Sequence, residues 1–287
     1  MTTSASSTHI EPASGTVEVR GLNLHYLDWG EPAGAVPGGA LPLVLLQGLG
    51  GAGGEWRRVA EHFQPRYRVI ALDQRGLGDS DHSAQHAYAT DDFVADLEAF
   101  VDALGLERFV LCGHSMGGHN AIAFTARHPE RVACALANDI PPALERNPEE
   151  IAKGFPGGRQ PVFASIEEYV TSRRASSTLT PEPMLRLAAE TRLRRVEGGY
   201  QAKADANLSI HWAPADLWQE ARTITRPIFF VRAGRSDVLD AATLQRMDMA
   251  VGPARSITLE QSGHSTYLDM EPEFLAVASQ FFAAHSR

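Results

Sequence analysis

The chain has 287 residues, 44% of them hydrophobic and 21% charged, which suffices for one large buried core and an inserted subdomain. Its formal net charge of -9 argues against nucleic acid and anionic membranes as partners, because both select basic surfaces. No apolar run approaches the roughly 18 residues of a membrane span. Residues 1–15 lack the basic start and apolar stretch of a secretory signal, so we expect a disordered tail and a cytoplasmic protein. Cys112 and Cys134 are expected to be buried free thiols.

The elements predicted along the chain alternate between strands and helices. Alternating polar and apolar residues over 16–20 and 22–29 predict a first strand pair. Later strands are predicted from short apolar runs at 43–46, 68–72, 109–112, 132–137, 228–231 and 256–259, and helices from amphipathic stretches near 55–64, 91–104, 116–128, 240–250 and 271–284. Runs of this type are buried on both faces of a parallel sheet. The alternation therefore predicts a doubly wound, mostly parallel α/β fold with right-handed crossovers.

Residues 140–218 interrupt this alternation. We expect no buried strand there, only helical pieces such as 166–174 and 183–195 separated by Pro and Gly. Ligands of open α/β folds bind at the carboxyl edge of the sheet, so this interval is predicted to be a helical lid over that edge. The core then consists of residues 16–139 and 219–287.

Ser115 is the candidate nucleophile. It lies in Gly-His-Ser-Met-Gly, between the predicted strand 109–112 and a helix that begins at Met116. A serine on a sharp strand-to-helix turn has a strained backbone and an exposed hydroxyl, and small residues two positions away let neighbouring chain pass. The positive end of the helix also favours an oxyanion beside the serine.

The string GHSMGG, together with DQRGLGDS at 73–80 and Gly263-His264, resembles the α/β-hydrolase superfamily over almost the whole chain after residue 16. The resemblance implies an α/β-hydrolase fold and a serine hydrolase with a catalytic triad. In the superfamily the catalytic histidine follows the last strand, which His264 matches, and a serine needs such a base. No metal or cofactor is expected.

Two aspartates are candidates for the acid that orients His264. Asp237 follows the strand 228–231 in the G-x-x-D placement that is usual in the superfamily. Asp139 follows the strand 132–137, where some relatives keep their acid. We prefer Asp237 and keep Asp139 as the alternative acid. Either aspartate could instead have a purely structural role and cap the start of the segment that follows it.

The oxyanion hole is expected to use the backbone N–H groups of Leu49 and Met116. Leu49 follows Gly48 in the loop after the strand 43–46, where superfamily members usually have His-Gly. This chain has Gln47 in place of the histidine. A glutamine can also donate and accept hydrogen bonds, so it can brace the loop.

The substrate is expected to contact Gly48, His119 and Trp212. His119 lies one helical turn after Ser115, and Trp212 belongs to the apolar wall that the lid offers. Arg192 belongs to a basic cluster with three other lid arginines. The interval 140–218 contains ten basic and ten acidic residues, so a solvated helix face is favoured over an anion site.

The leading hypothesis is hydrolysis of a small carboxylic ester through an acyl-enzyme, and a related amide, lactone or thioester would use the same groups. The alternatives are C–C bond hydrolysis of diketones and a cofactor-free oxygenase that uses the His–Asp pair. A remote alternative is a non-catalytic ligand-binding module that has kept the triad. The expected partner is a small-molecule substrate, and the sequence leaves open whether the protein forms a homo-oligomer.

Overall fold

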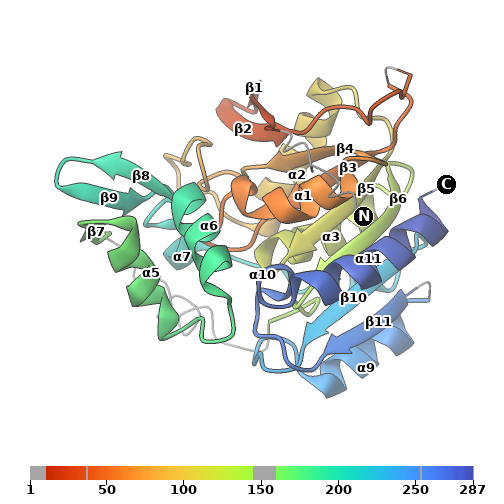
Figure 1. Cartoon of the computed structure of the whole chain (residues 1–287). Coiled ribbons are helices and arrows are strands. Elements are labelled where there is room, and N and C mark those ends of the chain that lie inside the picture. The colour runs from red at the N-terminus through yellow and green to blue at the C-terminus, as the bar shows by residue number, and fades with distance from the viewer. Residues whose placement is uncertain (1–10, 37, 145–159, 253, 287) are drawn as a thin grey trace, which may run out of the picture.

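The structure, a computed structural model, describes residues 11–36, 38–144, 160–252 and 254–286. A central sheet of eight strands has the order β1-β2-β4-β3-β5-β6-β10-β11 (Figure 1). The strands are β1 (Ala13–Val19), β2 (Leu22–Asp28), β3 (Pro42–Leu46), β4 (Arg68–Leu72), β5 (Phe109–His114), β6 (Val132–Asn138), β10 (Ile228–Ala233) and β11 (Ala254–Leu259). The six strands from β4 to β11 in this order are parallel, whereas β1 and β2 join one edge in antiparallel fashion. The predicted mostly parallel α/β-hydrolase sheet is confirmed.

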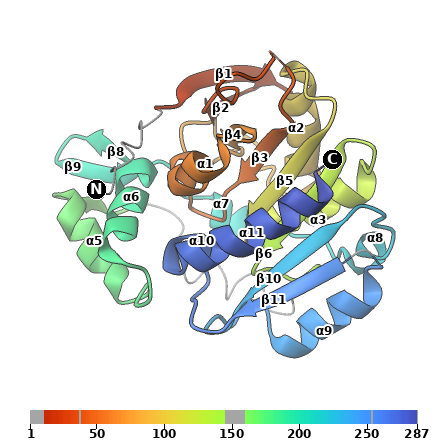
Figure 2. The ribbon, with the colours of Figure 1, turned by 45° about the vertical axis from the view of Figure 1, so that its right-hand side comes forward.

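Helices cover both faces of this sheet, as Figure 2 shows. They are α1 (Arg57–Phe63), α2 (Thr90–Ala103), α3 (Met116–Arg127), α8 (Trp218–Ala221), α9 (Ala241–Ala250), α10 (Thr266–Asp269) and α11 (Glu271–His285), and the short 3-10 helix η1 (Gly53–Trp56) precedes α1. Apolar side chains of α2, α3, α8 and α9 belong to the core on one face. Those of α1, α10 and α11 belong to the core on the other face.

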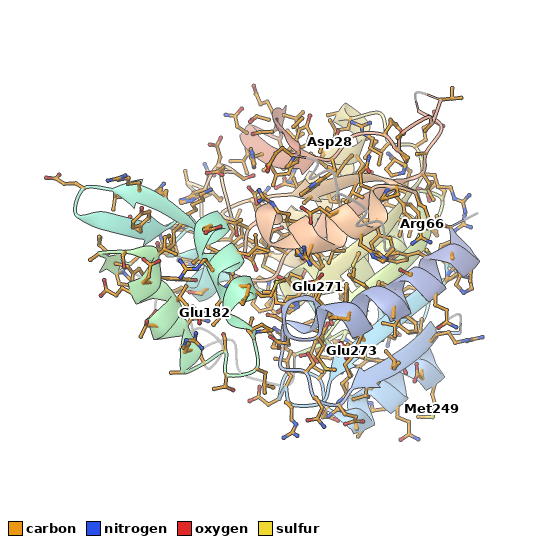
Figure 3. All side chains as sticks on the ribbon, viewed as in Figure 1. Asp28, Arg66, Glu182, Met249, Glu271 and Glu273 are labelled. Atoms are coloured by element: carbon orange, nitrogen blue, oxygen red, sulfur yellow. The ribbon has the colours of Figure 1, made fainter. Side chains whose placement is uncertain are left out.

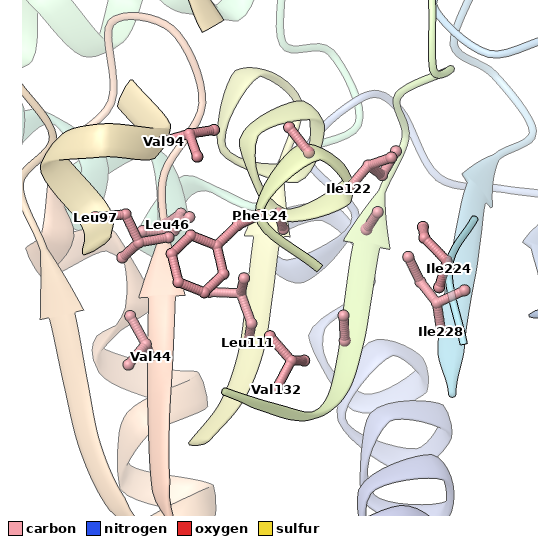
Figure 4. Packing of buried hydrophobic residues seen from close by; sticks show 14 of the residues in the cluster. Val44, Leu46, Val94, Leu97, Leu111, Ile122, Phe124, Val132, Ile224 and Ile228 are labelled. Carbon is pink, nitrogen blue, oxygen red and sulfur yellow. The ribbon is translucent and has the colours of Figure 1, made fainter. Parts of the chain in front are cut away.

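The strands carry apolar residues on both sides because both sides are covered. In β3, Val44 and Leu46 belong to one core cluster and Leu43 and Leu45 to the other. Figure 4 shows the first cluster, where Phe124 of α3 lies over the sheet beside Leu46. Charged side chains such as Arg66 and Glu273 are exposed on the outside (Figure 3).

The interval between β6 and β10 contains strands as well as helices, which corrects the expectation of a purely helical lid. Its elements are β7 (Val162–Phe163), α5 (Ile166–Arg174), α6 (Glu182–Arg192), β8 (Leu193–Val196), β9 (Gly199–Ala202) and α7 (Leu208–His211). A helix was expected to continue to residue 195, but α6 ends at Arg192. Gly198 and Gly199 have positive φ angles of 85° and 146°, and they allow the chain to turn tightly into a β8–β9 hairpin.

The lid has a small core of its own. Tyr169 and Val170 of α5 are buried against Leu185 and Ala189 of α6, and Leu193 of β8 completes the cluster. Residues 145–159 of the predicted lid lie outside the described residues. So do residues 1–10 of the predicted tail, and β1 begins at Ala13, within the interval expected to be disordered.

Two further expectations concern the cysteines and membrane-spanning segments. Cys112 and Cys134 are both free and buried, as predicted. Among the described helices, none combines the length and the apolar composition that crossing a membrane requires.

Candidate active site

Ser115 lies at the sharp turn between β5 and α3. Its φ of 52° and ψ of -121° are strained for a residue with a side chain. A Cβ on Gly113 would lie 2.2 Å from the Gly117 carbonyl oxygen, and one on Gly117 would lie 2.4 Å from the Leu46 carbonyl oxygen. Both glycines are therefore required by the close approach of backbone, and Ser115 lines a cavity that the lid residues also line.

His264 lies in the loop between β11 and α10 and lines the same cavity. Its Nδ1 is 2.7 Å from Asp139 Oδ2. Asp139 is fully buried, and its Oδ1 accepts a hydrogen bond from Ala233 N at 3.0 Å. Because Nδ1–H donates to a carboxylate, Nε2 is the ring nitrogen that is left to accept a proton.

The preference for Asp237 as the orienting acid is wrong in this geometry. The imidazole has one Nδ1–H, and Asp139 accepts it. Asp139 follows β6 with a φ of 49°, a turn that directs its carboxylate past the end of β10 toward the histidine loop. Asp237 follows β10 and lines the cavity wall. The two loops end at the same edge of the sheet, so residue type alone did not distinguish them.

The two predicted oxyanion donors lie on segments that meet at Ser115. Gly48 and Leu49 line the cavity, and a Cβ on Gly48 would lie 3.1 Å from Ser115 Cβ. Met116 is the first residue of α3, so its N–H has no acceptor within the helix. This arrangement agrees with a role for the N–H groups of Leu49 and Met116, which stays a prediction.

Gln47 braces the loop where the superfamily usually has histidine. In the amide orientation that satisfies both ends, its side chain donates to Leu72 O at 2.6 Å and accepts from Gln74 N at 3.2 Å. Its backbone oxygen accepts from Gln74 Nε2 at 2.8 Å, and Gln74 Oε1 accepts from Asn120 Nδ2 at 2.7 Å. The side-chain amides of Gln47, Gln74 and Asn120 therefore form a neutral hydrogen-bond network that holds the loop after β3 in place.

The cavity has a volume of about 510 Å³ and lies between the sheet edge and the lid. This size is typical of sites for small molecules. Trp212 and Gly48 line it, as expected for residues that contact a substrate.

His119 does not line the cavity, and the expectation that it contacts the substrate is wrong. It is fully buried, because α3 is buried on all sides from Met116 to Thr125. Burial, with a smaller effect of the Arg127 charge, lowers the pKa of His119 to about 4. Its ring nitrogens have no hydrogen-bond partner among the described residues.

His114 is a cavity residue that the sequence analysis did not single out. Its ring centroid lies 4.6 Å from that of His264, and its Nε2 is 3.3 Å from Ser265 Oγ. Burial above all, and then the charges of His264 and Arg192, lower its pKa well below the usual value. His114 is therefore a neutral ring beside the candidate base.

Arg192 connects the lid to the core, which corrects its assignment to a solvated helix face. It forms a two-point ion pair with the buried Glu55 of η1, with Nε–Oε1 at 2.7 Å and Nη2–Oε2 at 2.5 Å. Glu55 also accepts from Tyr267 Oη at 3.0 Å and from Ala52 N at 2.7 Å. Burial opposes the charge of Arg192, but the Glu55 carboxylate outweighs it and raises the pKa of Arg192.

Comparison with known proteins identifies a matching family and several similar hydrolases. The sequence model of the family described as "alpha/beta hydrolase fold" matches residues 42–270. The chain is 26% identical over 215 residues to 2-(acetamidomethylene)succinate hydrolase of Mesorhizobium japonicum, which covers 72% of this chain and 76% of the relative. It is 28% identical over 278 residues to 3-hydroxybutyrate-oligomer hydrolase of Cupriavidus necator, covering 90% of this chain and 92% of the relative.

A third relative is 2-hydroxy-6-oxo-2,4-heptadienoate hydrolase of Pseudomonas putida, 26% identical over 263 residues, with 86% of this chain and 91% of the relative covered. The crystal structure of E-2-(acetamidomethylene)succinate hydrolase superposes with a TM-score of 0.81 and 22% identity, covering 95% of this chain and 99% of that one. At this identity the superposition supports the fold.

Proposed function

From the premise that the chain belongs to the α/β-hydrolase family and is a hydrolase, we propose that it hydrolyses a small carboxylic ester through an acyl-enzyme. In this proposal Ser115 is the nucleophile, His264 is the general base and Asp139 orients His264. The observation that supports it best is the His264 Nδ1–Asp139 Oδ2 hydrogen bond in the cavity that Ser115 also lines.

The chemical steps follow from these positions. Ser115 Oγ attacks the ester carbonyl carbon while His264 Nε2 takes the hydroxyl proton, and Asp139 stabilises the imidazolium. The carbonyl oxygen becomes an oxyanion and accepts hydrogen bonds from Leu49 N and Met116 N. The bond to the leaving alcohol then breaks, and that alcohol receives the proton from His264. Water repeats the sequence on the acyl-enzyme and releases the acid.

Within the described residues no hydrogen bond joins Ser115 Oγ to His264. Contacts of this kind often shorten only when substrate binds. The relevant geometry is therefore the shared cavity together with the fixed orientation of the imidazole.

A second candidate function is C–C bond hydrolysis of diketone substrates. It is favoured by the similarity to the 2-hydroxy-6-oxo-2,4-heptadienoate hydrolase, whereas the similarity to the 3-hydroxybutyrate-oligomer hydrolase favours ester cleavage. Both reactions need an oriented histidine beside a serine. Purified protein offered matched esters, amides, lactones and diketones would separate them, because the preferred bond should give the highest kcat/KM.

The serine assignment has a direct test. A fluorophosphonate probe should add once to the intact protein, as measured by mass, because the activated Ser115 attacks phosphorus. Ser115→Ala should abolish both the labelling and the hydrolysis of p-nitrophenyl butyrate. Ser14→Ala, on the exposed strand β1, is the matched control and should keep both. Labelling that persists in Ser115→Ala would contradict the proposal.

The proposed partner is a small molecule, in line with the cavity volume of about 510 Å³. We also propose a cytoplasmic location. The two buried free thiols support it, since reducing compartments keep cysteines in this state.

A further inference from the structure

The cavity has a basic side that the ester reaction does not use. Arg173 lies at the end of α5 and lines the cavity together with Tyr169, one helical turn before it. Ser177 and Thr180, in the segment between α5 and α6, line the same part of the wall. The Thr180 hydroxyl donates to Asp269 Oδ1, so the guanidinium of Arg173 and the Ser177 hydroxyl are the donors that this short stretch of the lid offers to the cavity.

The charge of Arg173 is not compensated as the charges of Arg192 and Arg174 are. Arg192 also lines the cavity, but Glu55 binds it through two contacts. The adjacent Arg174 pairs with Glu182, which Figure 3 labels on the lid. For the Arg173 side chain, no ion pair or hydrogen bond is found within the described part of the chain.

The surroundings of Arg173 favour an anion. The side chain is partly buried, and burial is the main reason why its pKa is lowered, with the nearby charge of Arg192 acting in the same direction. Tyr169 and Glu55 act in the opposite direction and do not restore it. A charge withdrawn from water is costly without a partner, so a bound anion would lower the free energy of this region.

The geometry of the group selects the kind of anion. A guanidinium presents paired N–H donors that match the two oxygens of a carboxylate. Hydroxyls such as that of Ser177 supply further donors to the same oxygens. Among the described residues, three acidic ones line the cavity. Glu55 is bound by Arg192 through two contacts. Asp237 and Asp240 lie in the segment after β10 and do not contribute to the lowered pKa of Arg173.

We propose that Arg173 binds a carboxylate that the substrate carries in addition to its scissile bond, so that half-esters and similar acid derivatives are the preferred substrate class. This inference rests on the proposed ester hydrolysis for the identity of the bond. Because the second carboxylate is remote from the reacting carbonyl, its contact with Arg173 contributes mainly to binding and hence to KM.

The test compares charged and neutral versions of the same ester. Mono-p-nitrophenyl glutarate is compared with its methyl-capped diester, and the butyrate ester of 4-hydroxybenzoate with that of methyl 4-hydroxybenzoate. The first pair places the carboxylate on the acyl side and the second on the leaving-group side. Wild type should prefer the charged member of at least one pair by about 10- to 100-fold in kcat/KM, the usual size of a charge-assisted contact.

Arg173→Gln should reduce that preference to near unity, chiefly through KM. Arg173→Lys should keep part of it, because the charge stays but the two-point geometry is lost. Arg174→Gln is the matched control, since Arg174 is the next residue, is exposed and pairs with Glu182 outside the cavity wall. Equal kcat/KM for both members of both pairs in wild type, or a preference that survives Arg173→Gln, would overturn the inference.

A binding measurement separates this outcome from failure of the proposed function. Calorimetry with glutarate should show binding to the intact wild type that weakens about 10-fold or more in Arg173→Gln and persists in Arg174→Gln. If no ester in either pair is hydrolysed but this pattern of binding is found, ester hydrolysis fails and the carboxylate site stands. If esters are hydrolysed and glutarate binds both variants equally, the carboxylate site fails alone.

Discussion

Asp139 meets two structural requirements at once. One oxygen accepts from His264 Nδ1 and the other from the backbone of β10 at Ala233, so neither can rotate away without leaving a buried donor unpaired. The residue is fully buried and sits on a backbone with a φ of 49°. Its carboxylate is therefore fixed in position before any substrate arrives.

We expect Asp139→Asn to reduce kcat by roughly 10⁴-fold, or about 5 kcal/mol of transition-state stabilisation, because an amide no longer holds the required tautomer of His264. Asp237→Asn should cost far less, since Asp237 lines the cavity wall while Asp139 occupies Nδ1. The measurement is kcat and KM on a p-nitrophenyl ester, with circular dichroism to verify folding. A loss in Asp237→Asn equal to that in Asp139→Asn would assign the acid differently.

His119 should make the stability of the protein depend on pH. Its pKa of about 4 in the folded state lies below the usual histidine value of 6.5, so the unfolded chain binds more protons between these two pH values. Stability is thus full above pH 6.5 and falls as the pH drops from 6.5 toward 4. At pH 5 the loss relative to pH 7 from this residue alone is about 2 kcal/mol.

Urea unfolding of wild type and His119→Met at pH 7 and pH 5 measures this effect. The substitution changes packing at both pH values. The informative comparison is therefore how much unfolding free energy each protein loses between pH 7 and pH 5. We expect the variant to lose about 2 kcal/mol less than wild type on acidification. Identical losses in the two proteins would show that His119 does not titrate as its burial implies.

At the scale of elements, the connection between lid and core is concentrated in few groups. Arg192 ends α6 and Glu55 lies in η1, shortly after the loop that contains Leu49. Tyr267 lies in α10, just after the loop that contains His264. One carboxylate therefore ties together the lid and two loops of the site. Glu55 is fully buried, so its charge depends on these partners.

Glu55→Gln should destabilise the protein by about 3–5 kcal/mol, because it leaves the Arg192 charge without its counter-ion. The double variant Glu55→Met with Arg192→Met should be much closer to wild type, since apolar groups of similar length replace the pair. Denaturant unfolding of wild type, Glu55→Met, Arg192→Met and the double variant forms a thermodynamic cycle. Losses that simply add would mean that the pair is not coupled.

The elements also show how far a sequence reading extends. The buried strands and amphipathic helices of the core follow from apolar runs, and Ser115 and His264 line the cavity as expected. The lid strand β8 was missed because four residues with one buried position give no periodic signal. Asp139 was ranked second because the backbone turn that directs it is not marked by residue type, and His114 was missed for a similar reason.

For the whole molecule, one pair of neighbouring strands in the central sheet is joined by a long stretch of chain. β6 is buried along its full length and pairs with β10, yet the lid separates them by about 90 residues. At ribosomal speeds of about 5–20 residues per second, β10 is synthesised roughly 5–20 seconds after β6. Throughout that time β6 is the open edge of an apolar half-sheet, which chaperones or other chains can bind. The inserted lid thus delays closure of the sheet in every newly made copy.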